Sequence, residues 1–174
     1  MSENSNRIII GHSKASDGTA MHKMAGLSGL DQNSLYYYLL FGKYFAKTSA
    51  VARINGQMAG FVTGFAAPER PDTLFIWQVG VGSDFRGQGL ARQMLLYLIK
   101  SSAASCKYLE ATVNPSNKAS QALFRSVAKQ LEADWEFSEQ VFSEKDFLPT
   151  VHEAERLFCI GPFGSKAQDH KAET

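Results

Sequence analysis

The spacing of apolar positions divides the chain into segments of two kinds. Short runs rich in β-branched and aromatic residues predict strands, whereas apolar residues three and four positions apart predict helices. The predicted strands cover residues 7–12, 49–54, 58–66, 73–82, 107–113, 135–141 and 155–160. The predicted helices lie within residues 17–27, 31–45, 90–101 and 115–131. The resulting element order is β-α-α-β-β-β-α-β-α-β-β.

Turn and capping residues mark where several of these elements begin and end. Asn55-Gly56 between two strand runs is a strong hairpin signal, because both residue types tolerate positive φ. A polar loop over residues 68–72 is expected before the next strand. Asn114 followed by Pro115 predicts an N-cap and a first helical residue. An antiparallel first half joined to a parallel β-α-β-α section predicts a mixed α/β sheet with helices on both faces.

Composition places the chain among ordinary globular proteins. Its 174 residues, 44% hydrophobic and 20% charged, suit one domain, predicted over residues 1–163 and followed by a polar, disordered tail at 164–174. The net charge of +1 gives no electrostatic reason to expect nucleic acid as a partner. No apolar run reaches membrane-spanning length and no signal peptide is apparent, so no membrane partner and a cytoplasmic location are expected.

The cysteines and histidines do not form a metal-binding pattern. Cys106 and Cys159 lie in apolar strand runs and lack metal-ligand spacing. Two buried thiols in a reducing compartment are favoured, with a disulfide as the alternative. The sequence also lacks a His-x-x-x-His pair and a dense carboxylate group, so no metal is expected.

Residues 86–91, Arg-Gly-Gln-Gly-Leu-Ala, connect a strand run to a helix run and predict an anion site. Such a turn presents unpaired N–H groups at the helix N-terminus, where the helix dipole is positive. Gly87 and Gly89 permit close approach to the backbone, and Arg86 adds a positive charge. The loop has neither the Gly-Lys-Ser/Thr end of a Walker A sequence nor the position of a Rossmann fingerprint. A pyrophosphate is the expected ligand, and the alternative is a tight turn whose glycines serve packing alone.

This loop resembles the acetyl-CoA site of the GNAT acetyltransferase superfamily. The resemblance is carried by Arg86-x-x-Gly89-x-Ala91 after a strand and by Asn114-Pro-x-Asn117 before a later helix. It implies a mixed, mostly antiparallel sheet of six to seven strands with a splayed central parallel pair, and acetyl-CoA as co-substrate. The coenzyme-binding positions that it implies are Val79, Val81, Arg86, Gly87, Gln88, Gly89, Leu90, Ala91, Asn117 and Phe124.

A closer resemblance, over residues 8–163, is to the L-2,4-diaminobutyrate acetyltransferases of ectoine synthesis. The segments that carry it are residues 31–40, 60–65, 70–79 and 109–120. The string Arg-Pro-Asp-Thr-Leu-Phe-Ile-Trp at 70–77 is the most specific part, because the fold does not require it. The resemblance implies acetyl transfer to the 4-amino group of the diamino acid, for osmotic protection, by a homodimer. Direct transfer in a ternary complex is expected, since neither cysteine has an activating base beside it in the sequence.

Two other functions fit the same loop. An acetyltransferase could act on another amine, such as a polyamine, an aminoglycoside antibiotic or a protein N-terminus. A catalytically silent acyl-CoA sensor is the second alternative. Phe124 favours the sensor, because many members of the superfamily have there a tyrosine that protonates the leaving thiolate, and phenylalanine has no proton to donate.

Three residues are expected close to the chemistry. The substrate amine enters as an ammonium with a pKa of about 10.4, so a base must accept its proton before the nitrogen can attack. Glu110, in a strand run, could be that base directly or through water, or could form a salt bridge at the sheet surface. His152 could be the base, could bind the substrate carboxylate, or could lie at a loop surface. The N–H of Val79 is the expected oxyanion donor.

The remaining candidates are expected to bind the diamino acid, whose two ammonium groups need acidic, hydroxyl or aromatic partners. Trp77 could place its ring over an ammonium group, with core packing as the alternative. For Asp31 and Asn33 the alternative is helix capping. The full set of predicted substrate-binding residues is Asp31, Asn33, Ser34, Tyr38, Tyr44, Trp77 and Thr112.

Overall fold

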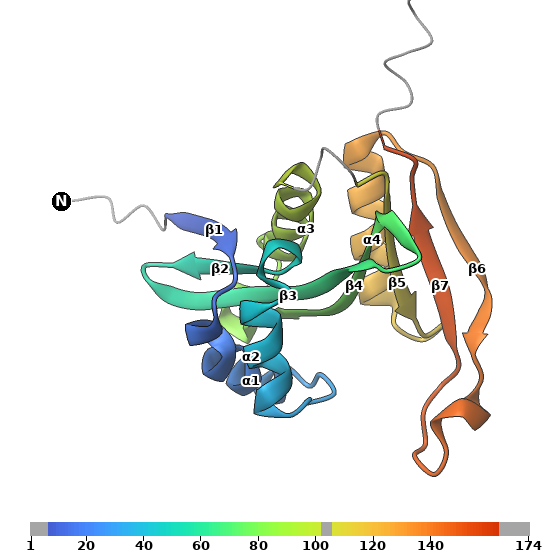
Figure 1. The fold of residues 1–174 in the computed structure, drawn as a ribbon, viewed down its shortest axis with the longest axis horizontal. Coiled ribbons are helices and arrows are strands. Elements are labelled where there is room, and N and C mark those ends of the chain that lie inside the picture. Colours follow the sequence, from blue (N-terminus) through green and yellow to red (C-terminus); the bar gives the residue numbers. More distant parts are fainter. Residues whose placement is uncertain (1–6, 102–105, 164–174) are drawn as a thin grey trace, which may run out of the picture. The chain divides into compact units, whose positions relative to one another are not determined.

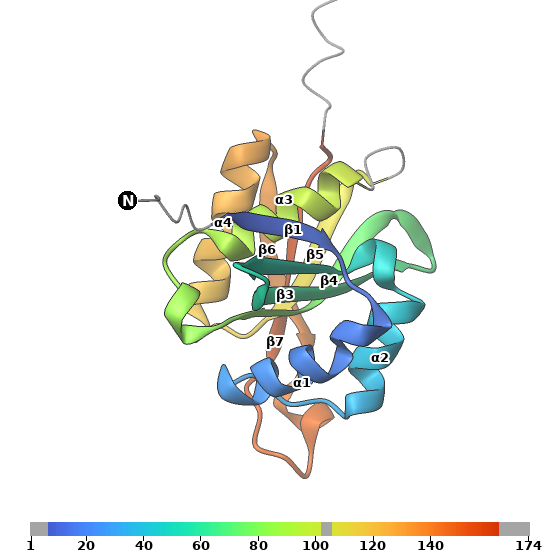
Figure 2. The same ribbon diagram turned by 90° about the vertical axis from the view of Figure 1, so that its left-hand side faces the viewer.

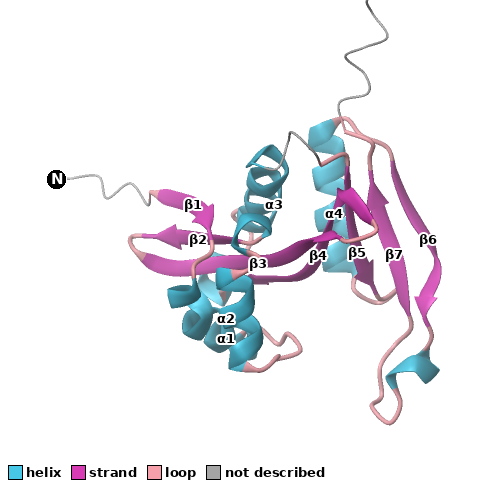
Figure 3. Ribbon diagram, viewed as in Figure 1, coloured by secondary structure: helices cyan, strands magenta, loops and turns pink. Residues whose placement is uncertain are grey.

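The computed structural model describes residues 7–101 and 106–163, which form seven strands and four α-helices (Figures 1 and 3). The predicted tail at 164–174 lies outside the described residues. The strands are β1 (Ile8–His12), β2 (Ala50–Ile54), β3 (Gln57–Ala67), β4 (Arg70–Val81), β5 (Tyr108–Val113), β6 (Trp135–Phe142) and β7 (Glu155–Ile160). The helices are α1 (Gly18–Leu27), α2 (Leu35–Lys43), α3 (Leu90–Ser101) and α4 (Lys118–Leu131). This order confirms the predicted one, and both bounds of α3 agree with the prediction.

The strands are hydrogen-bonded in the order β1-β2-β3-β4-β5-β7-β6. The pairs β1/β2, β2/β3, β5/β7 and β6/β7 are antiparallel, and β4/β5 is parallel. The parallel pairing joins residues 73–75 of β4 to residues 108–110 of β5. The predicted mixed, mostly antiparallel sheet with one central parallel pair is therefore confirmed.

The described residues divide into two compact units. The first unit holds residues 7–65 and 76–101, and the second holds residues 66–75 and 106–163. In the first unit, α1 and α2 lie on one face of the strands and α3 lies on the other (Figure 2). The single domain expected over residues 1–163 stays a prediction. No helix in the described ranges is long and apolar enough to cross a membrane.

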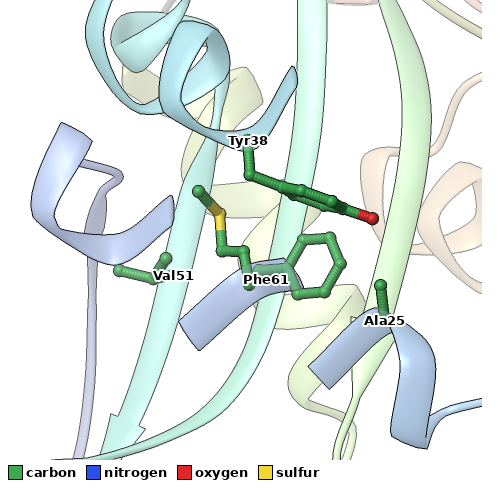
Figure 4. Packing of buried hydrophobic residues seen from close by; sticks show 5 residues of the cluster. Ala25, Tyr38, Val51 and Phe61 are labelled. Atoms are coloured by element: carbon green, nitrogen blue, oxygen red, sulfur yellow. The ribbon is translucent and has the colours of Figure 1, made fainter. Parts of the chain in front are cut away.

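Aromatic and aliphatic side chains from α1, α2, β2 and β3 form the core of the first unit. Tyr38 and Phe61 pack edge to face with ring centroids 5.9 Å apart, and Ala25 and Val51 are buried in the same cluster (Figure 4). Met21, one helical turn before Ala25, completes the set. Burial of this apolar surface holds the two helices on the sheet.

The hairpin predicted from Asn55-Gly56 is present. These two residues join β2 to β3 with φ angles of 52° and 80°, the positive values that a tight hairpin turn requires. The polar loop predicted over residues 68–72 is wrong in its length. Only residues 68–69 form the turn, because β4 already begins at Arg70.

The start of α4 also differs from the prediction. Asn117, not Asn114, is the N-cap, and its Oδ1 accepts a hydrogen bond from the Ser120 N–H at 3.0 Å. The Asn114 side chain instead accepts from the Asn117 N–H at 3.1 Å, so it closes a turn one step earlier. Pro115 lies within that turn.

Phe158 of β7 is the centre of the core of the second unit. Its ring centroid lies 5.5 Å from that of Phe124 on α4 and 5.2 Å from that of Trp135 on β6. Ala111 of β5 is directly opposite Phe158 in the antiparallel register. Since neighbouring side chains on a strand alternate between faces, α4 covers the face of β5 that carries Ala111, and Glu110 lies on the other face.

Candidate active site

The glycine loop of the first unit has the backbone geometry that an anion site needs. Gly87 and Gly89 have φ angles of 76° and 70°, a region that residues with a Cβ rarely adopt. A Cβ built on Gly87 would meet nothing within 4 Å. The glycine is therefore required by the turn and not by packing, which argues against the packing alternative. α3 begins at Leu90, directly after the loop.

The charge around this helix N-terminus favours an anion. The first turn of α3 contains no acidic residue. Its leading N–H groups have no carbonyl partner within the helix, and the dipole makes that end positive. Arg86 donates from Nε to the Val81 carbonyl at 3.4 Å and from Nη2 to the Ser28 carbonyl at 3.3 Å, which anchors its exposed guanidinium beside the loop.

Several predicted coenzyme positions contribute backbone rather than side chains. The Leu90 side chain is buried in the core, so only its N–H is available to a ligand. The Gln88 carbonyl accepts from the Gln93 side chain at 3.3 Å, which ties the loop to the second turn of α3. Val79 and Val81 are half-buried on β4, and Ala91 is half-buried on α3.

A buried polar chain fixes the segment before α2 on β4. The Tyr38 hydroxyl donates to Gln78 Oε1 at 3.0 Å, and Gln78 Nε2 donates to the Asp31 carbonyl at 2.7 Å. Burial raises the pKa of Tyr38. Tyr38 is fully buried and lies in the core of the first unit, where its hydroxyl is used by Gln78.

Trp77 is partly packed in the core and partly available to a ligand, the two alternatives considered for its ring. Its ring centroid lies 5.5 Å from that of Tyr37 and 6.4 Å from that of Phe65, yet 53% of the residue is exposed. Tyr37 in turn hydrogen-bonds Thr63 at 2.8 Å, and burial holds the pKa of Tyr37 well above its usual value. Trp77 thus has a packed side and a solvent side, which suits a ring that covers a ligand.

The other predicted substrate residues are only partly brought together. Ser34 is the N-cap of α2 and accepts from the Tyr37 N–H at 3.4 Å, while Asn33 hydrogen-bonds Tyr38. Tyr44 is the C-cap at the opposite end of α2 and is exposed. Tyr38 thus lies in the core and Tyr44 is exposed at the far end of the helix, and the substrate-binding roles of both residues stay predictions.

In the second unit, Glu110 is held by Arg70. The two guanidinium nitrogens Nη1 and Nη2 donate to the two carboxylate oxygens at 2.6 and 2.5 Å. Glu110 is buried, whereas the Arg70 side chain is half exposed. The hydrogen bonds to Glu110 raise the pKa of Arg70. The salt bridge predicted as the alternative for Glu110 is thus present, with its carboxylate buried and its guanidinium partly exposed. Thr112, two residues along β5, lies on the same face and is half-buried.

Both cysteines are free thiols. Cys159 is directly opposite Glu110 in the β5/β7 register. Burial, followed by the charge of Glu110, raises the pKa of Cys159 to about 11. Burial also raises the pKa of Cys106. Neither thiol is prepared as a nucleophile at neutral pH, and the disulfide alternative is wrong.

His152 lies in the segment between β6 and β7 and is held by its neighbours. Its Nδ1 is 2.6 Å from the Glu153 carbonyl, its Nε2 is 3.8 Å from Glu155 Oε1, and its ring stacks on Phe147 with centroids 4.0 Å apart. The Glu153 side chain accepts from the Ser116 N–H at 3.2 Å, which ties this segment to the turn before α4. His152 is therefore an ordered residue and not a loose loop side chain.

Comparison with known proteins identifies the family. The sequence profile of the acetyltransferase (GNAT) family matches residues 20–128. The L-2,4-diaminobutyric acid acetyltransferase of Halalkalibacterium halodurans is 48% identical over 89% of this chain and 82% of its own length. That of Marinococcus halophilus is 43% identical over 90% of this chain and 91% of its own length. The chain belongs to the GNAT acetyltransferase family.

Solved structures agree with this assignment. Diaminobutyrate acetyltransferase EctA from Paenibacillus lautus, in complex with L-2,4-diaminobutyric acid and coenzyme A, is 37% identical with a TM-score of 0.86, over 91% of this chain and 97% of that one. The ribosomal-protein-S18-alanine N-acetyltransferase of Escherichia coli has a TM-score of 0.69 at 19% identity, which shows the fold alone.

Two predicted coenzyme positions of this acetyltransferase lie on α4. Asn117 uses its side chain as the helix cap, and Phe124 is a core ring packed on Phe158. Phe124 thus contributes apolar packing only, and its ring offers no proton donor. Within the described residues, no group of three His, Cys, Asp or Glu side chains could hold a metal ion.

Sequence reasoning missed two residues of this acetyltransferase, Arg70 and Gln78. Arg70 stands at the start of the string 70–77 that carried the resemblance, and a glutamate in a buried strand run needs a cation. That pair of signals could have suggested Arg70. Gln78 could be found only from the fold, because its partners Asp31 and Tyr38 are 47 and 40 positions away.

Proposed function

We propose that this acetyltransferase moves the acetyl group of acetyl-CoA to the 4-amino group of L-2,4-diaminobutyrate. The product is N-4-acetyl-L-2,4-diaminobutyrate, an intermediate of ectoine synthesis. The observation that carries the proposal is the similarity to the Paenibacillus lautus enzyme, which was solved with this diamino acid and coenzyme A, over 91% of this chain. The curated relatives at 43–48% identity carry the same activity in their names.

The coenzyme is held at the glycine loop. The N–H groups of residues 87–91 and the N-terminus of α3 bind the pyrophosphate oxygens, with Arg86 as the neighbouring cation. Support comes from the positive φ angles of both glycines, the open space above Gly87 and the absence of acidic residues from the first turn of α3. The main chain of Val79 and Val81 on β4 continues this binding surface along the rest of the coenzyme.

Acetyl transfer is direct. The neutral 4-amino group attacks the thioester carbonyl, and the N–H of Val79 donates to the oxyanion. The carbon–sulfur bond then breaks, and the proton that the amide nitrogen loses balances the charge of the released coenzyme A thiolate. The raised pKa of Cys159 and Cys106 supports a route without an acetyl-cysteine intermediate. His152 is the candidate base that the geometry supports better, because both carboxylate oxygens of Glu110 are already hydrogen-bonded to Arg70.

The substrate is held between aromatic and polar groups. The solvent side of Trp77 covers an ammonium group, and Asp31, Asn33 and Ser34 supply polar atoms at the start of α2. Support comes from the exposure of Trp77 and from the hydrogen bond that fixes Asp31 to Gln78 on β4.

The working protein is a cytoplasmic homodimer that takes part in osmotic protection. The apolar side chains Leu35, Tyr36 and Leu39 are exposed on α2, and their burial against a second copy would remove this surface from water. The mass of the protein in solution tests the dimer, and cell fractionation tests the location.

An amine panel tests the substrate. Release of the coenzyme A thiol is followed with acetyl-CoA and either L-2,4-diaminobutyrate, putrescine, an aminoglycoside or a peptide with a free N-terminus. We expect kcat/KM to be at least ~100-fold higher for the diamino acid, because a pocket that pairs its charged groups rejects analogues that leave these groups unpaired. Mass spectrometry and NMR of the product identify N-4 as the acetylated atom. Equal rates on putrescine would contradict the proposal, and coenzyme binding without turnover would favour the sensor.

A further inference from the structure

The ion pair of Arg70 and Glu110 is asymmetric in its burial. The side chain of Glu110 is 3% exposed, and that of Arg70 is 56% exposed. Nη1 and Nη2 each give one N–H to the carboxylate, at 2.6 and 2.5 Å. A guanidinium has five N–H donors in one plane, so three remain on its other edges. The buried carboxylate therefore orients a guanidinium that still has donors on its exposed side.

The same arrangement is poorly suited to stability alone. A buried ion pair gains little over well-packed apolar residues, because both charges lose water. Arg70 nevertheless keeps more than half of its side chain in solvent. Because Glu110 already orders the Arg70 side chain, a ligand that binds its exposed edge loses little further conformational entropy. The planar guanidinium can also donate two parallel hydrogen bonds to a carboxylate.

The charged and polar groups around Arg70 also complement the charges of an amino acid substrate. Glu110 and Thr112 lie on the face of β5 that α4 does not cover, and Thr112 is a predicted substrate residue. Asp72 is the other carboxylate that acts on the Arg70 guanidinium, and Cys159 adds a neutral thiol. An oriented cation with one further carboxylate, Asp72, acting on it complements a substrate carboxylate that has an ammonium group beside it.

We infer that Arg70 binds the carboxylate of the amino acid substrate and that Glu110 is the positioning residue that orients Arg70. The inference rests on the proposed function, and it makes Arg70 the residue that selects amines that carry a carboxylate. Glu110 then acts through Arg70, and it takes no proton from the substrate amine.

The decisive comparison uses a substrate without the carboxylate. 1,3-Diaminopropane is L-2,4-diaminobutyrate with the carboxylate replaced by hydrogen. In the wild-type protein, kcat/KM for the diamino acid should exceed that for 1,3-diaminopropane by about 10- to 100-fold, the worth of charged hydrogen bonds. In R70Q/E110Q, which removes both charges and keeps a polar side chain at both positions, the ratio should fall close to one, mainly through the KM of the diamino acid. E110Q alone should lower the ratio, mainly by raising the KM of the diamino acid and not that of 1,3-diaminopropane.

A matched ion pair elsewhere controls for general damage. Arg53 and Asp17 in the first unit also join a partly exposed arginine to a buried carboxylate. R53Q/D17N should lower stability and leave the substrate ratio unchanged. If R70Q/E110Q does not fold, R70K decides, because lysine cannot hold Glu110 and a substrate carboxylate in two planar forks, and the ratio should still fall at least about fivefold.

The outcomes separate the two claims. A wild-type protein that does not acetylate the diamino acid overturns the proposed function. A wild-type preference that persists in the folded double variant, or in R70K, overturns the role of Arg70 and leaves the proposed function standing. If E110Q lost kcat on both the diamino acid and 1,3-diaminopropane, and the acidic limb of the pH–rate profile disappeared, Glu110 would be the base. This result would also overturn the inference.

Discussion

The glycine loop of the first unit and the Arg70–Glu110 pair of the second unit are two different ways to build a charged site. The loop uses the backbone of consecutive residues: two glycines with positive φ and the N-terminus of α3. The pair uses side chains that are 40 positions apart in the chain and meet only when β4 and β5 align. A backbone site tolerates changes of side chain but not of conformation, whereas the side-chain site depends on each partner. The two regions should therefore fail in different ways when they are mutated.

The largest effect is expected from breaking the ion pair on one side. R70A leaves the Glu110 carboxylate buried without its cation and should lower the free energy of unfolding by about 3 kcal/mol, the low end for a buried pair because Arg70 is half exposed. Urea denaturation measures this change. R70Q/E110Q should recover most of the loss, since it leaves no buried charge. A loss below about 0.5 kcal/mol in R70A would place the pair among weak surface ion pairs.

This contrast also explains how far the sequence alone reaches. The glycine loop, the Asn55-Gly56 hairpin and both bounds of α3 depend on neighbouring residues, and each was predictable from local patterns. Asn114 was chosen over Asn117 as the cap because both residues suit an N-cap, and only the hydrogen bonds distinguish them.

Residues of the candidate site that depend on distant partners were harder to predict. Tyr38 and Tyr44 lie on one helix, but packing against Phe61 of β3 decides which of the two is buried. Gln78 acquires its hydrogen bonds from residues at least 40 positions away, so no local pattern indicates them. Arg70 could be suggested only by combining its place in the string 70–77 with the need of a strand glutamate for a cation. The family resemblance pointed to the segments that contain both residues, but it did not pair either with its partner.

A smaller loss of stability is expected in the glycine loop, where the main effect should be on coenzyme binding. G87A forces a Cβ into a left-handed conformation and should cost about 1 kcal/mol of stability, because the space around the new methyl is open. It should raise the KM for acetyl-CoA about tenfold, since the shifted N–H groups no longer converge on the pyrophosphate. Steady-state kinetics and thermal unfolding measure the two effects.

Gly56 provides the matched control for this prediction. It has a φ of 80° and, like Gly87, nothing within 4 Å of an added Cβ, but it lies in the β2–β3 hairpin turn. G56A should cost a similar amount of stability and leave the KM for acetyl-CoA unchanged. If G56A and G87A changed that KM equally, the loop would not be the coenzyme site.

The smallest effect concerns the thiol beside Glu110. Burial and the charge of Glu110 raise the pKa of Cys159 from 9.0 to about 11, so the folded protein holds this proton more tightly than the unfolded chain. The resulting stabilisation is fully present below pH 9 and is lost as the pH rises through 11. C159A should therefore lose less stability than the wild type between pH 9 and 11, whereas C106A retains the Cys159 contribution.

The pH dependence of alkylation by iodoacetamide in C106A follows the Cys159 thiolate directly and separates the two causes. We expect a midpoint near pH 11 in C106A and a lower midpoint in C106A/E110Q, because the glutamine removes the negative charge opposite the thiol. An unchanged midpoint would mean that burial acts alone and that the charge of Glu110 is neutralised by Arg70 at the distance of Cys159. The net charge of the ion pair would then have no effect on the β7 side, and only the exposed edge of Arg70 would attract a charged ligand.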